Sequence, residues 1–127
     1  MVKVVITMVA VPSEDGKWRS DMYCYEEDDG DGVRLANAAT DSIRKALGQA
    51  EDEGSKPFNM GRPPPGTIPL WDVWVGTEKT SGRMWTDVCD YRKHPGCPQA
   101  MVAKMMDAYK ILRADLVDKN RKGKKHA

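Results

Sequence analysis

The sequence predicts an α+β domain with the element order β-β-α-β-β-α, in which a mostly antiparallel four-stranded sheet carries two helices mainly on one face. Two observations predict this fold. Two runs rich in β-branched and aromatic residues stand near the N-terminus, followed by an apolar repeat at three- and four-residue spacing. A second pair of strand-like runs and a second apolar repeat complete the chain.

The charge distribution divides the chain into a body and a tail. The last nine residues hold five basic side chains and no acid: Lys119, Arg121, Lys122, Lys124 and Lys125. Removing these five from the 20 basic residues leaves 15 against 19 acidic ones, with acidic patches at residues 26–31 and 51–53. We therefore expect one domain over residues 1–118 and a basic, flexible tail over 119–127.

Residues 2–11 predict the central strand of the sheet, because apolar side chains occupy both the odd-numbered and the even-numbered positions of the run. Pro12 ends this strand, and Asp15-Gly16 marks a tight turn into a second strand from Trp18 to Glu26. Side chains alternate along the second strand. We expect Trp18, Met22 and Cys24 to face the core, and Arg19, Asp21, Tyr23 and Tyr25 to lie on the opposite face.

A helix is predicted from about Val33 to Glu51, with Asp29 or Asp31 as its N-terminal cap. Its apolar stripe comprises Leu35, Ala36, Ala39, Ile43, Ala46, Leu47 and Ala50. Asp41 and Lys45, four residues apart, predict an ion pair on its surface.

Residues 52–67 contain four prolines and three glycines, so we expect neither helix nor strand there. The Pro63-Pro64-Pro65 run favours polyproline II geometry, which would present Phe58 and Arg62 on a stiff frame.

A hairpin is predicted from Leu70–Val75 and Arg83–Tyr91. Its register stays open at this stage. A turn centred on Lys79-Thr80 sets Asp72 opposite Asp87, whereas a three-residue loop ending at a left-handed Gly82 sets Asp72 opposite Asp90. Both registers oppose two carboxylates, which would require a neighbouring cation such as Arg19, Arg83 or Arg92. Alternatively, the acids lie on an exposed sheet face and do not approach each other.

The tryptophans of this hairpin predict an aromatic sheet face. Trp71 and Trp74 fall on opposite faces of one strand, so helices on a single face cannot cover both. Either the loop at 52–67 covers the second face, or that face is an interface for a partner.

The last helix is predicted from Pro98 to Asp118, with Pro98 at its first position. Its apolar seam is wide and comprises Met101, Val102, Met105, Met106, Tyr109, Ile111, Leu112, Leu116 and Val117. This width indicates either deep burial of the helix or a homodimer formed through its spare edge.

Candidate metal ligands are few. Cys24, Cys89, His94 and Cys97 could hold zinc, but the chain has no CxxC knuckle, and we expect no metal and no cofactor. The three cysteines are expected to be reduced thiols.

Recognised catalytic motifs are also missing: the chain has no GxSxG, Walker A or GxGxxG sequence. We therefore expect no enzyme. The N-terminal apolar run is too short to span a bilayer, which favours a cytoplasmic protein without a membrane partner.

These features favour a non-enzymatic interaction or inhibitory accessory protein, such as a phage-type anti-host or anti-defence factor, that binds a protein partner. The Pro-rich loop, the acidic patches and the aromatic sheet face would form the contact. The expected partner-binding residues are Tyr23, Tyr25, Phe58, Arg62, Trp71, Trp74 and Trp85. Two alternatives stay open: a nucleic-acid-binding accessory protein that uses the basic tail, and a small metal-dependent enzyme that uses the hairpin carboxylates.

Overall fold

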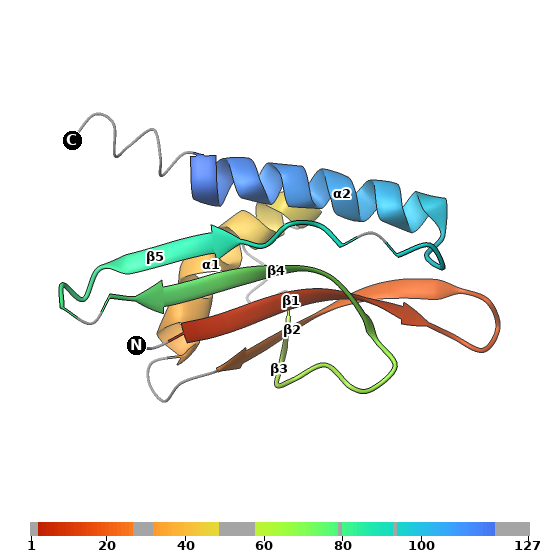
Figure 1. Cartoon of the computed structure of the whole chain (residues 1–127), viewed down its shortest axis with the longest axis horizontal. Helices are drawn as coiled ribbons and strands as arrows, with labels where there is room; N and C mark the ends of the chain where they lie inside the picture. The colour runs from red at the N-terminus through yellow and green to blue at the C-terminus, as the bar shows by residue number, and fades with distance from the viewer. Residues whose placement is uncertain (1–2, 27–31, 49–57, 79, 93, 119–127) are drawn as a thin grey trace.

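The computed structural model describes residues 3–26, 32–48, 58–78, 80–92 and 94–118. Within them the chain forms an α+β fold, with a five-stranded mixed sheet and two helices (Figure 1). The elements are β1 Lys3–Pro12, β2 Trp18–Glu26, α1 Gly32–Leu47, β3 Asn59–Met60, β4 Ile68–Thr77, β5 Met84–Val88, α2 Gln99–Arg113 and a terminal π-helical segment, η1 Ala114–Asp118.

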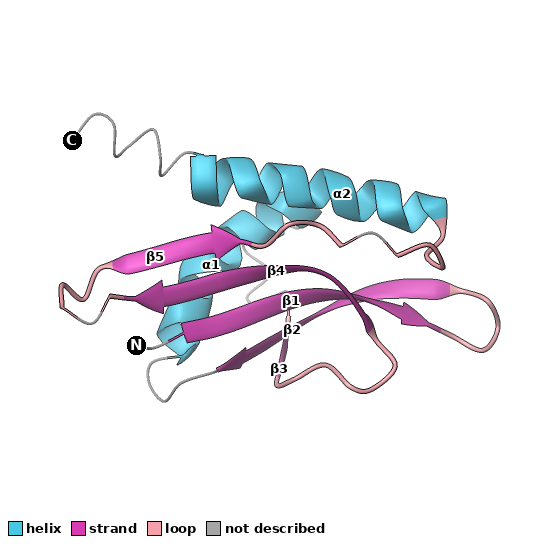
Figure 2. Cartoon of the chain, viewed as in Figure 1, coloured by secondary structure: helices cyan, strands magenta, loops and turns pink. Residues whose placement is uncertain are grey.

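The central position of the first strand is confirmed. The strands lie in the order β3-β2-β1-β4-β5, and β1 pairs antiparallel with β2 and with β4 (Figure 2). Every described side chain from Val4 to Ala10 is buried. The turn after β1 is also where it was predicted, because Gly16 has a left-handed φ of 79° and donates its N–H to the Ser13 carbonyl.

The sheet contains one strand that the sequence did not predict. Asn59 and Met60 form β3, which pairs parallel with β2 and makes the sheet mixed. The Asn59 side-chain amide donates to Asp21 Oδ1 at 3.0 Å and to the Met22 carbonyl at 3.2 Å. These bonds fasten the Pro-rich segment to the sheet edge. The expectation of neither helix nor strand in 52–67 is therefore wrong at Asn59–Met60 and holds for residues 61–67, while residues 52–57 lie outside the described residues.

Helix α1 is shorter than predicted. It ends at Leu47 because Gly48 takes a left-handed φ of 72°, the conformation that commonly closes a helix. The Lys45 ammonium, expected to pair with Asp41, lies 3.3 Å from Asp115 Oδ1 in η1 instead. The predicted caps Asp29 and Asp31 lie outside the described residues.

Both helices cover the same face of the sheet and enclose the core (Figure 1). The even-numbered side chains of β1 face them, together with the buried residues of the α1 stripe: Ala36, Ala39, Ile43 and Ala46. From β4, a register shift opposite Met8 and Val9 allows two successive residues, Leu70 and Trp71, to enter this core.

Helix α2 begins at Gln99, and Pro98 is its N-cap rather than its first helical residue. The seam prediction holds for its centre, where Met105, Ala108 and Leu112 are buried. The spare edge is narrower than the sequence indicates: Ile111 is 42% exposed, whereas Met106 is half-buried.

Candidate functional site

The sheet has a second face, on which no described helix lies. We call it the uncovered face and define it by the residues that alternate away from the helices. They are Val5, Thr7 and Val9 of β1, Asp21, Tyr23 and Tyr25 of β2, Asp72 and Trp74 of β4, and Trp85 and Asp87 of β5. The predicted facing of Tyr23 and Tyr25 is therefore confirmed, and of the two tryptophans expected on opposite faces it is Trp74 that lies on this one.

Strand register sets these side chains in rows across the sheet. In one row Tyr25, Val5, Trp74 and Asp87 are direct neighbours on successive strands. The next row contains Tyr23, Thr7 and Asp72 in the same order. Trp85, opposite Gly76, is diagonal to Trp74 on the same face.

Short side chains on β1 form the floor of this face. Val5 and Thr7 are at most 4% exposed, although no described helix covers them. Large side chains flank them on both sides, since Tyr25 and Trp74 are the neighbours of Val5. The aromatic rings therefore bury the β1 side chains beneath them, and each ring itself stays half-buried.

The Pro-rich loop reaches this face through one side chain. The Arg62 guanidinium lies over the Tyr25 ring, with its Cζ atom 4.4 Å from the ring centroid. Such a cation–π contact fixes a long, otherwise mobile side chain. The Gly61 N–H donates to the Cys24 carbonyl at 2.7 Å, which holds the loop beside β2. Among residues 58–67, Arg62 is the residue for which the structure shows a contact with an aromatic ring of the uncovered face.

A second arginine pairs with a carboxylate on the same face. Arg92 Nη2 donates to Asp72 Oδ2 at 2.6 Å, and the Arg92 backbone N–H donates to the Leu70 carbonyl. The hydrogen bond to Asp72 is the main reason that the pKa of Arg92 lies above its ordinary value. The Asp72 carboxylate is thus neutralised within the protein.

Neither of the two registers that would oppose carboxylates is formed. The Glu78 N–H donates to the Arg83 carbonyl and the Gly82 N–H to the Glu78 carbonyl, so Glu78 and Arg83 close the loop of the hairpin. This loop sets Trp74 opposite Asp87, and the Cys89 N–H donates to the Asp72 carbonyl at 2.9 Å. Asp72 therefore faces neither Asp87 nor Asp90, which removes the paired-carboxylate geometry behind the metal-dependent enzyme alternative.

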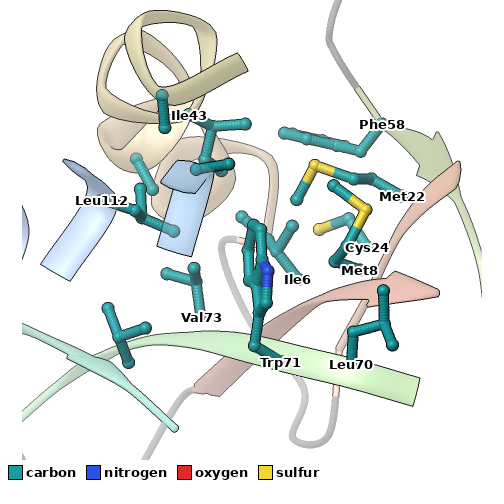
Figure 3. Packing of buried hydrophobic residues seen from close by; sticks show 14 of the residues in the cluster. Ile6, Met8, Met22, Cys24, Ile43, Phe58, Leu70, Trp71, Val73 and Leu112 are labelled. Carbon is teal, nitrogen blue, oxygen red and sulfur yellow. The ribbon is translucent and has the colours of Figure 1, made fainter. Parts of the chain in front are cut away.

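Two expected partner-binding residues lie in the core instead of on the uncovered face. Trp71 is fully buried, and its Nε1–H donates to the Met105 carbonyl of α2 at 3.2 Å. Phe58 is 6% exposed and packs against the sulfur-bearing side chains of Met22 and Cys24 (Figure 3). Regular alternation with Val73, before the register shift, points Trp71 toward the helices, and the β3 pairing brings Phe58 to the core.

The candidate zinc ligands are not brought together. Cys24 and Cys97 belong to the core, Cys89 follows β5 beside Asp72, and His94 is exposed with its Nδ1 accepting the Gly96 N–H at 3.2 Å. Among the described residues no cluster of His, Cys, Asp or Glu could hold a metal ion. Burial, followed by the charges of Asp72 and Asp87, raises the pKa of the Cys89 thiol.

Sequence reasoning missed two members of the uncovered face. Arg92 was considered only as a cation for a carboxylate pair, and Asp87 only as half of such a pair. Closing the hairpin loop with Glu78 and Arg83 would have placed Asp87 opposite Trp74. The basic tail at 119–127 lies outside the described residues.

Comparison of the chain with models of protein families, with curated proteins and with solved structures finds no match. None of the helices in the described ranges has both the length and the apolar character needed to cross a membrane.

Proposed function

We propose that this chain is a non-enzymatic interaction protein that binds a protein partner through the uncovered face. One observation carries the proposal. Four aromatic rings gather on the one face that the described helices leave open: Tyr23, Tyr25, Trp74 and Trp85. Arg62 and Arg92 lie beside them. Tyrosine, tryptophan and arginine are the residues that most often provide the binding energy of protein interfaces.

The charges of this face favour protein over nucleic acid. By strand alternation and contact it carries three arginines, Arg19, Arg62 and Arg92, and three aspartates, Asp21, Asp72 and Asp87. Nucleic-acid surfaces need a surplus of positive charge to follow the phosphate backbone. A balanced set of charges around aromatic rings is what a protein interface uses to set partner and register.

We propose an accessory or inhibitory role for this binding, of the kind that phage factors play against host machinery. In such a role the protein needs no reaction of its own, because occupying a surface of the partner is sufficient. The proposal is supported by the position of the aromatic and arginine side chains and rests on no catalytic residue.

Affinity capture with face-specific variants tests the proposal. Immobilised wild-type chain and an Ile111→Ala variant, altered on the helix side, should capture the same defined protein from a lysate of the source cell. Trp85→Ala, altered on the uncovered face, should lose it. Thermal unfolding of both variants controls for folding.

Two outcomes contradict the proposal. Equal capture by Trp85→Ala and wild type would exclude the uncovered face as the binding surface. Retention of DNA or RNA at low salt, lost on deletion of residues 119–127, would favour the nucleic-acid alternative.

A further inference from the structure

Along one row of the uncovered face, the side chains change from basic through apolar to acidic. From the β3 side to the β5 side, the row presents the Arg62 guanidinium, the Tyr25 ring, the Val5 side chain, the Trp74 ring and the Asp87 carboxylate. A cation therefore stands at one end, an anion at the other, and apolar groups lie between them.

The Arg62 guanidinium, at the β3 side of the row, is preorganised for binding. Arg62 is exposed, and its guanidinium carbon lies 4.4 Å from the centroid of the Tyr25 ring beneath it. A guanidinium stacked on a ring keeps its in-plane N–H donors for a carboxylate, and it loses less side-chain freedom on binding than a free arginine would. No carboxylate within the described residues forms an ion pair with Arg62.

The anion at the other end is held in place as well. Asp87 is exposed, and its Oδ1 accepts the N–H of the next residue, Val88, at 2.9 Å. Between the two ends, Asp72 and Arg92 neutralise each other at 2.6 Å. In this row the charges that no described ion pair balances therefore lie at its two ends, with opposite signs. Arg19 and Asp21 also lie on this face, opposite Val11 and Val9 and outside the row.

The length of the row indicates which backbone conformation of a bound partner segment fits it. Tyr25 on β2 and Asp87 on β5 are three strand spacings apart, which is about 14 Å at about 4.8 Å per spacing. In an extended chain every second side chain points to the same face, and four residues span about 13 Å. A helix returns to one face after seven or eleven residues, at about 10 or 16 Å, and matches this length less well.

We infer that the partner presents an extended peptide segment across the strands, with an acidic side chain at one position, an apolar side chain two residues on and a basic side chain four residues on. The acidic side chain meets Arg62, the apolar one packs against the half-buried rings of Tyr25 and Trp74 above the buried Val5, and the basic one meets Asp87. This assignment rests on the proposed function and names the chemistry of the partner of that same face.

Three synthetic peptides test the inference with the full chain. Each is a nine-residue, end-capped peptide of Ser and Gly, with three alternating central positions occupied by Glu-Leu-Lys, Lys-Leu-Lys or Glu-Ser-Lys. The indole N–H signals in a two-dimensional NMR titration measure binding. The Trp74 signal should shift, and the Trp71 signal, buried under α2, should stay in place.

The wild-type chain should bind the Glu-Leu-Lys peptide about fivefold more tightly than the Lys-Leu-Lys peptide, because an exposed charge pair contributes up to about 1 kcal/mol. It should also bind it more tightly than the Glu-Ser-Lys peptide, because serine buries less apolar surface than leucine. Arg62→Glu should reverse the order of the Glu-Leu-Lys and Lys-Leu-Lys peptides. Arg83→Glu, the same charge change on an exposed residue outside the row, should leave it unchanged.

Three results overturn the inference. They are equal dissociation constants for the three peptides, an equal effect of Arg62→Glu and Arg83→Glu, and a shift of the Trp74 signal by oligothymidylate but by no peptide. The first two refute the charge pattern, and the third assigns the face to single-stranded nucleic acid.

Affinity capture separates this inference from the proposed function. If capture is lost in Trp85→Ala but kept in Arg62→Glu, the peptide chemistry is wrong and the proposed function stands. If capture is kept in Trp85→Ala, the proposed function itself is wrong.

Discussion

The two faces of the sheet bury the side chains of β1 by different means. Toward the helices, Ile6 and Met8 lie under α1 and α2 and belong to one continuous apolar core. On the uncovered face, Val5 and Val9 are equally buried, yet no described helix lies over them. The large rings of Tyr25 and Trp74 flank Val5 on the neighbouring strands, whereas Asp21 and Pro69 flank Val9.

The comparison teaches that complete burial of a central strand does not require a second layer. A row of short side chains between two rows of long ones is buried by its neighbours. Those neighbours then form the outer surface, which on this sheet consists of tyrosine, tryptophan, arginine and aspartate. One face therefore provides stability through a dry core, and the other presents chemistry to the solvent.

Replacing one tryptophan on each face gives the largest test of this difference. Trp71→Ala should lower the free energy of unfolding by about 3–5 kcal/mol, because it leaves a cavity in the core. Trp85→Ala, on the half-buried face, should cost about 1 kcal/mol. Urea unfolding of both variants measures the two losses, and equal losses would show that the faces do not differ in this way.

Gly48 closes helix α1, one of the two helices that cover the core face of the sheet. Gly48→Ala should cost about 1 kcal/mol, because alanine resists the left-handed φ of 72°. No atom lies within 4 Å of the added Cβ, so strain alone is measured. Gly48→Asn, which tolerates this conformation better, is the matched control. A loss in Gly48→Asn as large as in Gly48→Ala would point to another cause.

The ion pair of the uncovered face should contribute less. A double-mutant cycle of Asp72→Asn and Arg92→Gln is expected to give a coupling below about 1 kcal/mol, because the Arg92 side chain is 43% exposed and solvent screens the pair. The coupling should fall between 50 mM and 1 M NaCl. A coupling that does not change with salt would mean that this face excludes water as the core does.

The smallest expected effect concerns the alkylation rates of the cysteine thiols, which also compare the uncovered face with the core. With iodoacetamide, Cys89 should react before Cys97, and Cys24, in the core, should react last. Burial is the first cause that raises the pKa of Cys89 above 9.0, with Asp72 and Asp87 adding to it, so Asp87→Asn should speed its alkylation at pH 8. Mass spectrometry after timed quenching measures the order.

The same thiol gives a pH dependence with a defined sign. A pKa raised in the folded state favours the neutral thiol, so its contribution to stability is complete below the unfolded pKa of about 9 and is lost as the pH rises through the folded value. Wild-type stability should therefore fall above about pH 9 more than that of Cys89→Ser. Identical pH profiles would contradict the raised pKa.

Local pattern was sufficient for much of this fold. Uniform apolar character placed β1 at the centre, and alternation assigned the two faces of β2. The separation of Trp71 and Trp74 also followed from the sequence alone. These features depend on neighbours a few residues apart, whose directions the backbone fixes.

Only the tertiary structure decided how the uncovered face is assembled. The path of the chain after Phe58 depends on bonds from Asn59 to β2, nearly forty residues earlier. The hairpin register depends on which loop closes before Arg83, and a shift by one residue moves every side chain to the other face. The sequence by itself determined that side chains alternate between the two faces of a strand. The tertiary structure decided which hairpin residues face away from the helices and that Arg62 and Asp87 stand at opposite ends of one row. Pairing between distant strands has no local signal, and that pairing sets the row.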